Sequence, residues 1–340
     1  AVMISAGGRI LENMLGWPKW VIVALVAIVT TSYTTFGGLR ASVITDAYHF
    51  ALHAFLFSGI LLYELLTHFQ GGSASFAQEA VAATADGFRT ATFLEIVTFI
   101  VAFLLGETLI PPYANLALAS RTTQVSRISF VLAGCFSVVW FAVMIAIGIV
   151  ARPLVAGDPS EDFVLLKLVK ATAPHAAYAL MSVALLSVIL SSLDSLLNAG
   201  AVVFTQDVLR RFTVRQDSAA LTAGRYSTIL IAAVASGLAV FVPSVIKGLL
   251  VCYGIWAPAI LPAAIIGLWT KRPRPLAAFL SMIVGTTVGA AVGIVFLLYQ
   301  QGQGRVSKVE TPAILPALVC SLLAYLIGHR LHRYVGGPDR

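Results

Sequence analysis

One stretch of the sequence places cation-binding side chains on an apolar background. Residues 186–211 read LSVILSSLDSLLNAGAVVFTQDVLRR, and their middle third carries five polar side chains: Ser191, Ser192, Asp194, Ser195 and Asn198. On a helix of 3.6 residues per turn, Ser191, Ser195 and Asn198 share one face, and an adjoining stripe holds Val188, Ser192 and Ser195. Hard cations are bound by oxygen ligands such as hydroxyls, carboxylates and carbonyls. The stretch therefore predicts a helix that presents oxygen ligands to a small cation such as sodium.

Two aspartates lie within apolar segments, Asp194 in this helix and Asp46 in the segment 43–67. An ionisable group at bilayer depth costs about 2.5 to 3.5 kcal/mol on insertion scales unless it has a partner. Neither aspartate has Lys or Arg three or four positions away, which favours a bound cation or a proton as the compensating charge. Two structural alternatives stay open: Asp46 starts a helix near the interface, and Asp194 pairs with Ser, Lys or Arg from another helix.

Four more titratable side chains lie at membrane depth. Glu95 and Glu107 occupy the segment 91–118, where either side chain is able to protonate, pair or touch a solute. His49 and His53 follow Asp46 on one helical face, a spacing compatible with a proton relay or with packing.

The three cysteines lie singly within apolar segments, without CxxC spacing or a nearby His, and are interpreted as small buried hydrophobes: Cys135, Cys252 and Cys320.

The elements that position these residues are membrane helices. The 340 residues are 59% hydrophobic and 11% charged, whereas soluble domains carry about 25% charged residues. A spanning helix needs about 20 mainly apolar residues. Runs that meet this test predict an all-α polytopic membrane protein with about nine spanning helices in one transmembrane domain, 1–340: 18–36, 43–67, 91–118, 127–151, 176–204, 226–242, 244–269, 275–299 and 312–329.

Basic residues orient these helices. The net charge of +7 is spread over short loops instead of a stripe, which argues against nucleic acid as a partner. If the loop 38–42 is cytoplasmic, more basic residues fall on the cytoplasmic side than outside, as the positive-inside rule expects. Short helices are then predicted in outer-side connections near 75–87 and 160–172. The opening Ala1-Val2-Met3 reads as the end of a helix, so we expect a preceding N-terminal piece.

Helix-breaking residues interrupt two of the segments. Gly106 and Pro111-Pro112 break up 91–118, and 244–269 contains Gly254, Pro258 and Pro262. Broken helices in transporters expose carbonyls and helix ends to ligands at mid-membrane, although a simple kink is the alternative. A ridge of Gly285, Gly289 and Gly293 in 275–299 predicts a packing face.

Four stretches in this order resemble signatures of the solute:sodium symporter family, which has the leucine-transporter type of inverted-repeat fold: Tyr33 to Asp46, Pro112 to Arg121, Leu190 to Arg211 and Ile266 to Arg272. The resemblance covers essentially the whole chain but starts part-way through the family's architecture. It implies a sodium site made by Ser191, Ser192 and the carbonyl of Val188, completed by a helix outside these residues. It also implies a second cation, or a proton, at Asp46, Asp194 and Ser195.

The resemblance implies a sodium-coupled symporter that works by alternating access in a bacterial inner membrane, with sodium as a co-transported ligand and no cofactor. The solute is expected near Gly106 and Glu107, together with Tyr253 and Trp256. Because 250–262 lacks the Gln or Asn of sugar-transporting relatives, an organic acid or amino acid is favoured over a sugar. A sensor or regulatory membrane subunit without transport is the alternative. Enzyme activity is not expected, since GxSxG and a His placed to activate a serine are missing from the sequence.

Overall fold

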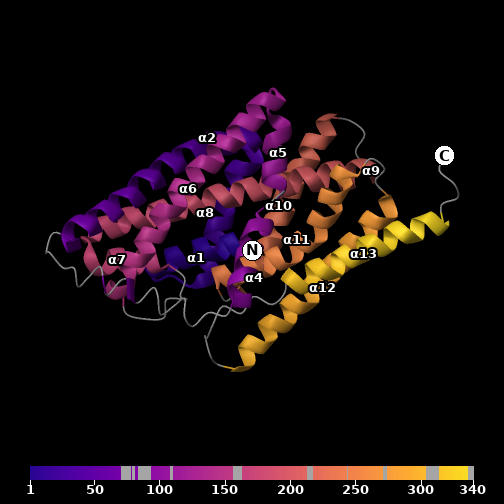
Figure 1. Cartoon of the computed structure of the whole chain (residues 1–340). Helices are drawn as coiled ribbons and strands as arrows, with labels where there is room; N and C mark the ends of the chain where they lie inside the picture. The colour runs from indigo at the N-terminus through magenta and orange to yellow at the C-terminus, as the bar shows by residue number, and fades with distance from the viewer. Residues whose placement is uncertain are drawn as a thin grey trace. The chain divides into compact units, whose positions relative to one another are not determined.

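The computed structural model describes residues 1–69, 78, 81–82, 93–107, 110–155, 163–212, 217–242, 244–270, 274–303 and 314–335. Every element that these residues form is a helix (Figure 1). Eight segments are long and apolar enough to cross a membrane. The predicted all-α polytopic membrane fold is therefore confirmed.

The count of eight differs from the predicted nine because two predicted spans form one continuous segment. Helix α2, Lys19–Phe69, has 51 residues and contains both 18–36 and 43–67. At 1.5 Å per residue it would measure about 75 Å if straight, more than twice the hydrocarbon thickness. Gly38 interrupts it with φ 57° and ψ −157°, a conformation that essentially only glycine adopts. The chain thus bends between two spans.

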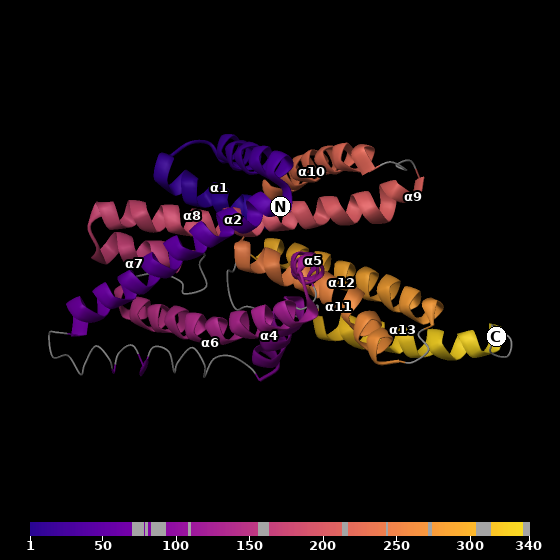
Figure 2. The same ribbon diagram turned by 90° about the horizontal axis from the view of Figure 1, so that it is seen from above.

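The chain divides into two compact units, and the first comprises residues 1–88 and 111–245. Helix α8, His175–Val203, contacts α1, α2 and α10, and both views in Figures 1 and 2 show it alongside α1 and α2. The unit's other helices are α1 Val2–Leu15, α5 Pro111–Ala119, α6 Thr123–Leu154, α7 Val164–Thr172, π-helix η1 Phe204–Leu209, α9 Arg210–Phe212 and α10 Asp217–Ala239.

Two apolar clusters hold α8 along its length. Met181, Ala184 and Ile189 pack with side chains of α1, α2, α6 and α7, whereas Leu193 and Leu197 pack with α1, α2 and α10. Because both clusters are buried, the helix cannot rotate without exposing apolar core. The polar side chains between and beside them are therefore held in fixed directions.

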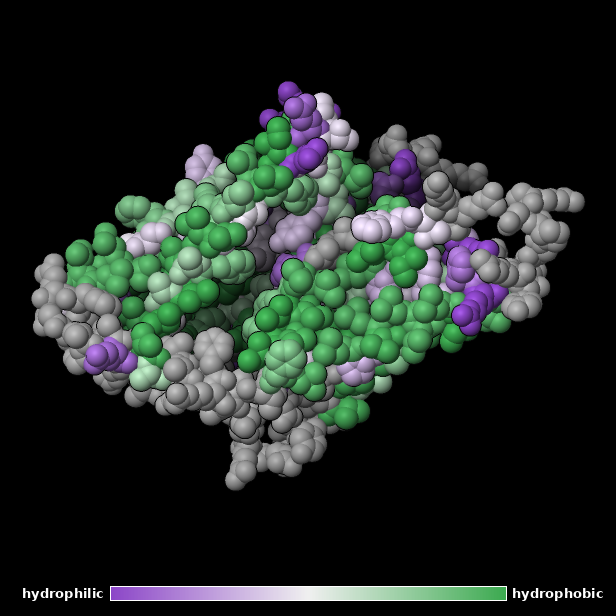
Figure 3. Space-filling model, in the orientation of Figure 1, coloured by the Kyte–Doolittle hydropathy of each residue, from purple (hydrophilic) through white to green (hydrophobic). Residues whose placement is uncertain are grey.

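The second unit comprises residues 89–110 and 246–340. Its described helices are α4 Phe93–Gly106, α11 Val245–Trp269, α12 Pro275–Gln303 and α13 Ile314–Val335. The predicted interruption of 91–118 is confirmed, since α4 ends at Gly106 and α5 begins at Pro111. In Figure 3 the visible face over α12 and α13 is mainly hydrophobic, as a lipid-facing surface requires.

The predicted break in 244–269 is wrong, because α11 runs through Pro258 and Pro262 as one helix. Each proline lacks an N–H and so frees the carbonyl four residues earlier, at Gly254 and at Pro258. The Ser321 hydroxyl donates to the Pro258 carbonyl at 2.7 Å. A protein donor therefore satisfies one of the two freed groups, and the helix continues.

The predicted glycine ridge of α12 is confirmed as a packing face. A Cβ added at Gly289 would lie 2.3 Å from the Gly254 carbonyl oxygen, and one at Gly285 would lie 2.2 Å from that of Pro258. A Cβ at Gly293 would meet Val251 at 3.2 Å. Glycine thus allows the backbones of α11 and α12 to approach closely.

Of the two predicted outer-side helices, the one near 160–172 is present as α7, Val164–Thr172. Residue 163 precedes it with φ 70°, an uncommon conformation for Phe163. The one predicted near 75–87 lies almost entirely outside the described residues.

We expect Gly289→Ala to destabilise the protein by about 1 to 3 kcal/mol, because the new methyl group forces α12 away from the α11 backbone. Thermal unfolding of the purified protein in detergent measures the change. Gly267→Ala on α11 is the matched control, since nothing lies within 4 Å of its Cβ position. Equal melting temperatures for the two variants would contradict the close approach.

Candidate functional site

Asp46 on α2 and the serines of α8 form one end of a polar cluster inside the first unit. The Ser191 hydroxyl donates to Asp46 Oδ1 at 2.5 Å, and the Ser195 hydroxyl donates to Asp46 Oδ2 at 3.4 Å. Ser191 and Ser195 are one helical turn apart, so one carboxylate reaches both. The shared face predicted for these serines is therefore turned toward Asp46.

Asp194 forms the other end of this cluster and is completely buried. Ser42 donates to Asp194 Oδ1 at 3.0 Å, and Thr45 lies 3.4 Å from Oδ2. The hydroxyls of Ser42 and Ser195 are 3.4 Å apart, which connects the two carboxylates through hydroxyl groups. We call the six residues the carboxylate–hydroxyl cluster: Ser42, Thr45, Asp46, Ser191, Asp194 and Ser195.

The cluster has two acidic groups and no Lys or Arg partner in the described part of the chain. The charges and hydrogen bonds acting on Asp46 and Asp194 come from each other and from Ser, Tyr and His side chains, without Lys or Arg. Hydroxyl donors stabilise a carboxylate but do not neutralise it. A hydroxyl that donates its proton keeps lone pairs for a cation. The arrangement is therefore suited to bind a small cation or a proton.

The other two predicted sodium ligands lie next to the cluster on α8: Ser192 directly follows Ser191, and Val188 precedes Ser192 by one turn. The Ser192 hydroxyl donates to the Val188 carbonyl at 3.1 Å, the local bond that serines in membrane helices often make. Both oxygens keep lone pairs after this bond. Sodium binding by Val188, Ser191 and Ser192 stays a prediction. The structure places the Val188 carbonyl and the two serine hydroxyls at adjoining positions of one helix.

Sequence reasoning did not select Ser42, Thr45 or Tyr33. Ser42 precedes Asp46 by four residues, so helical spacing places both on one face of α2, and this signal could have identified it. The Tyr33 hydroxyl donates to the Leu190 carbonyl at 3.4 Å, immediately before Ser191. Tyr33 lies before the Gly38 bend, and helical spacing does not predict which residues share a face on the two sides of a bend.

The four predicted solute ligands lie in the second unit, where three of them meet. The Tyr253 hydroxyl donates to Glu107 Oε1. A Cβ at Gly106 would lie 2.3 Å from the ring of Tyr253, so only glycine leaves room for that ring. Trp256 is half-buried on the same helix, and its Nε1 has no hydrogen-bond partner among the described residues.

The histidines after Asp46 pack among aromatic rings. The ring centroid of His53 lies 5.3 Å from that of Trp140 and 5.6 Å from that of Phe50. The Nδ1 atoms of His49 and His53 are buried without a hydrogen-bond partner in the described structure. The described hydrogen bonds therefore do not form a relay from Asp46, and they favour the packing interpretation.

Comparison with known proteins identifies the family to which the chain belongs. The model of the sodium:solute symporter family matches residues 1–285. The chain is 27% identical to the osmoregulated proline transporter of Bacillus subtilis, with 96% of this chain and 66% of the transporter covered. It is 23% identical to the sodium/pantothenate symporter of Haemophilus influenzae over 97% of this chain and 68% of that protein.

A mammalian relative is more distant. Sodium/glucose cotransporter 1 of Oryctolagus cuniculus is 22% identical over 94% of this chain and 55% of the cotransporter. The chain thus spans between about half and two-thirds of the length of these relatives.

Replacing Ser42 tests how much its hydrogen bond to Asp194 contributes to the stability of the folded protein. We expect Ser42→Ala to lower the free energy of unfolding by about 1 to 3 kcal/mol in sodium-free buffer, since a buried carboxylate oxygen loses a hydrogen bond. Thermal unfolding measures the loss. Ser182→Ala is the matched control, because Ser182 is equally buried on α8 but bonds only the Tyr178 carbonyl of its own helix. A loss no larger than in the control would contradict a supporting role for Ser42.

Proposed function

Because the chain belongs to the sodium:solute symporter family, we propose that it moves a small organic solute across a membrane together with sodium. The observation that carries the proposal is the pair of carboxylates and four hydroxyls that two spanning helices bring together without Lys or Arg. Such a cluster at membrane depth is stabilised when a cation occupies it.

We assign the cation to two neighbouring sets of oxygens on α8. The first comprises the Ser191 and Ser192 hydroxyls and the Val188 carbonyl. The second comprises Asp46, Asp194 and Ser195, with Ser42 as an additional ligand. Ser191 contacts Asp46, so the two sets adjoin. A cation bound at one set therefore changes the electrostatic potential at the other. This arrangement supports two coupled cations, or one sodium ion and one proton.

The cation acts on the conformational equilibrium through α2 and α8. A bound cation attracts oxygens from both helices, so it favours the arrangement in which these oxygens converge. A ligand shifts a two-state equilibrium only by its differential affinity for the two states. We propose that sodium stabilises the outward-open state, in which solute binds, and that both leave after the bundle rocks to the inner side.

The solute is proposed to be an organic acid or an amino acid. Two relatives are named for proline and pantothenate, both of which carry a carboxylate, and a third is named for glucose. In the second unit, Glu107 and the Tyr253 hydroxyl supply hydrogen-bonding groups beside Gly106, with Trp256 on the same helix as Tyr253. Glu107 suits the ammonium of an amino acid.

The bacterial relatives support a bacterial inner membrane as the location of this multi-pass protein.

The first test is uptake by the complete protein in proteoliposomes. We expect labelled proline, pantothenate or a related carboxylate to accumulate under an inward sodium gradient, and glucose to accumulate less. Ser191→Ala and Ser192→Ala should each raise the sodium concentration for half-maximal uptake about tenfold, which corresponds to about 1.4 kcal/mol for a lost ligand. Ser182→Ala on the same helix is the control. Unchanged sodium activation in both variants would overturn the site.

A second test concerns the number of cations. Asp194→Asn keeps the shape of the side chain and removes one charge, so the second cation should bind weakly. We expect the Hill coefficient for sodium to fall toward 1, while Asp207→Asn, at an exposed position in η1, leaves it unchanged. An unaltered Hill coefficient in Asp194→Asn would remove Asp194 from the cation site.

A further inference from the structure

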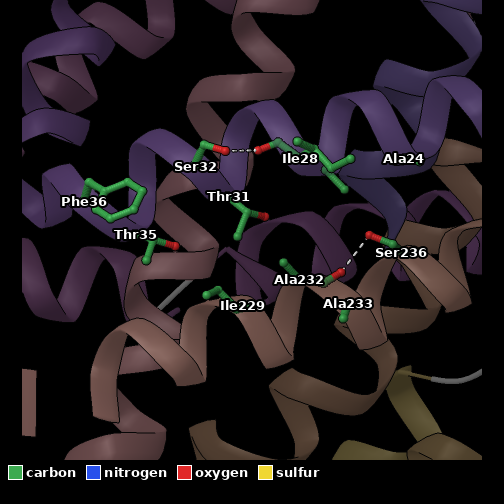
Figure 4. A pocket seen from close by; sticks show the side chains of 11 residues that line it. Ala24, Ile28, Thr31, Ser32, Thr35, Phe36, Ile229, Ala232, Ala233 and Ser236 are labelled. Atoms are coloured by element: carbon green, nitrogen blue, oxygen red, sulfur yellow. Dashed lines mark hydrogen bonds between the residues drawn. The ribbon is translucent and has the colours of Figure 1, made fainter. Parts of the chain in front are cut away.

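A pocket of about 420 Å³ lies between α2 and α10 of the first unit (Figure 4), and none of its lining residues belongs to the carboxylate–hydroxyl cluster. Thr31 and Thr35 lie toward the Phe36 end of the pocket, whereas alanines and Ser236 lie nearer Ala24. The lining residues come from α2 before its bend and from the middle of α10: Ala24, Ala27, Ile28, Thr31, Ser32, Thr35, Phe36, Ile229, Ala232, Ala233 and Ser236.

The two helices run antiparallel along this pocket. Lys19 Nζ donates to the Val240 carbonyl at 2.9 Å, which joins the start of α2 to the residue that follows α10. From that crossing, α2 proceeds toward Phe36 while α10 is followed backward toward Ile229, and both of these residues line the pocket. The bend of α2 and the start of α10 therefore lie at the same end.

The pocket opens toward the surface of a spanning segment. Ile28 is 64% exposed and Ile229 is 48% exposed, and Ala24 and Ala233 are also exposed. Both helices are long and apolar enough to cross a membrane, so the bilayer is the solvent at this surface. An acyl chain is consequently the molecule available to fill the apolar part of the pocket.

The two threonines toward the Phe36 end of the pocket require polar partners. Thr31 Oγ1 and Thr35 Oγ1 are buried without a hydrogen-bond partner among the described residues, and Figure 4 shows both side chains projecting from α2 toward α10. Unsatisfied hydroxyls in hydrocarbon are unfavourable. The ester carbonyls of a phospholipid, which lie between its acyl chains and its phosphate, are acceptors at the appropriate position along such a molecule.

Basic residues follow at the same end. Arg40 follows Phe36 by four positions, just beyond the Gly38 bend, and Arg225 comes one helical turn before Ile229. Both arginines are exposed. Guanidinium groups bind phosphate by bidentate hydrogen bonds, and basic residues at a membrane surface attract anionic lipids.

We propose that the α2–α10 pocket binds one anionic phospholipid. Its phosphate contacts Arg40 and Arg225, its ester carbonyls accept hydrogen bonds from Thr31 and Thr35, and one acyl chain lies along the alanines of both helices. The site is separate from the proposed sodium ligands. Its occupancy holds the part of α2 before the bend against α10.

Native mass spectrometry of the complete protein tests this site. The protein is purified from vesicles that contain equal amounts of phosphatidylglycerol and phosphatidylcholine with the same acyl chains. We expect one phosphatidylglycerol to remain bound in preference to phosphatidylcholine. Arg40→Gln combined with Arg225→Gln should reduce this retention about 30-fold, as expected for the loss of two surface charges.

Pocket-filling variants test the acyl chain separately. Ala24→Phe and Ala233→Phe fill the pocket from exposed positions and should displace the lipid, whereas Val234→Phe, beside the pocket on α10, should not. Arg127→Gln on α6 is the control for charge. Equal retention of both lipids, or retention unchanged in the arginine and Phe variants, would overturn the proposal. Because sodium activation of uptake is measured independently, failure here leaves the proposed transport function untouched.

Discussion

The cost of placing two carboxylates within membrane-spanning helices governs the rest of the first unit. Asp194 is fully buried, and Asp46 lies in hydrogen-bond contact with the same helix, yet both lack a Lys or Arg partner among the described residues. Neutral hydroxyls solvate the carboxylates without cancelling their charge. A cation or proton at the proposed site would supply the missing charge, and its binding would be energetically coupled to the geometry of α2 and α8.

That coupling depends on the elements that hold the two helices. Apolar clusters on both sides of the polar residues fix the rotation of α8, and the bend at Gly38 permits α2 to continue as a second span that carries Ser42 and Asp46. A side chain at position 38 would be strained at φ 57°. The site thus uses rigid packing for one helix and a glycine-dependent bend for the other.

Much of this arrangement was predictable from the sequence, because hydropathy determines which segments span and helical period determines which serines share a face. The spans, the interruption after Gly106 and the glycine ridge of α12 follow from such local rules. The contacts across helices do not. Ser42 could be predicted from its spacing from Asp46, whereas Thr45 and Tyr33 join the site through the packing of α2 against α8. The continuous helix α11 was mispredicted because prolines were interpreted without knowledge of their neighbours.

The carbonyl oxygens that the prolines of α11 free are engaged by protein contacts. Proline within a helix frees carbonyl oxygens, and such oxygens are ligands for cations where a helix is broken. In α11 the carbonyl of Pro258 accepts from Ser321, and glycines of α12 pack against the carbonyls of Gly254 and Pro258. The Ser321 hydroxyl and the α12 backbone therefore occupy the space beside these carbonyls that an ion would need. On α8, by contrast, hydroxyl and carboxylate oxygens gather around two uncompensated charges. The same requirement, that polar groups in hydrocarbon find partners, is met by a close helix contact in one unit and leaves two carboxylates without a compensating charge among the described residues of the other.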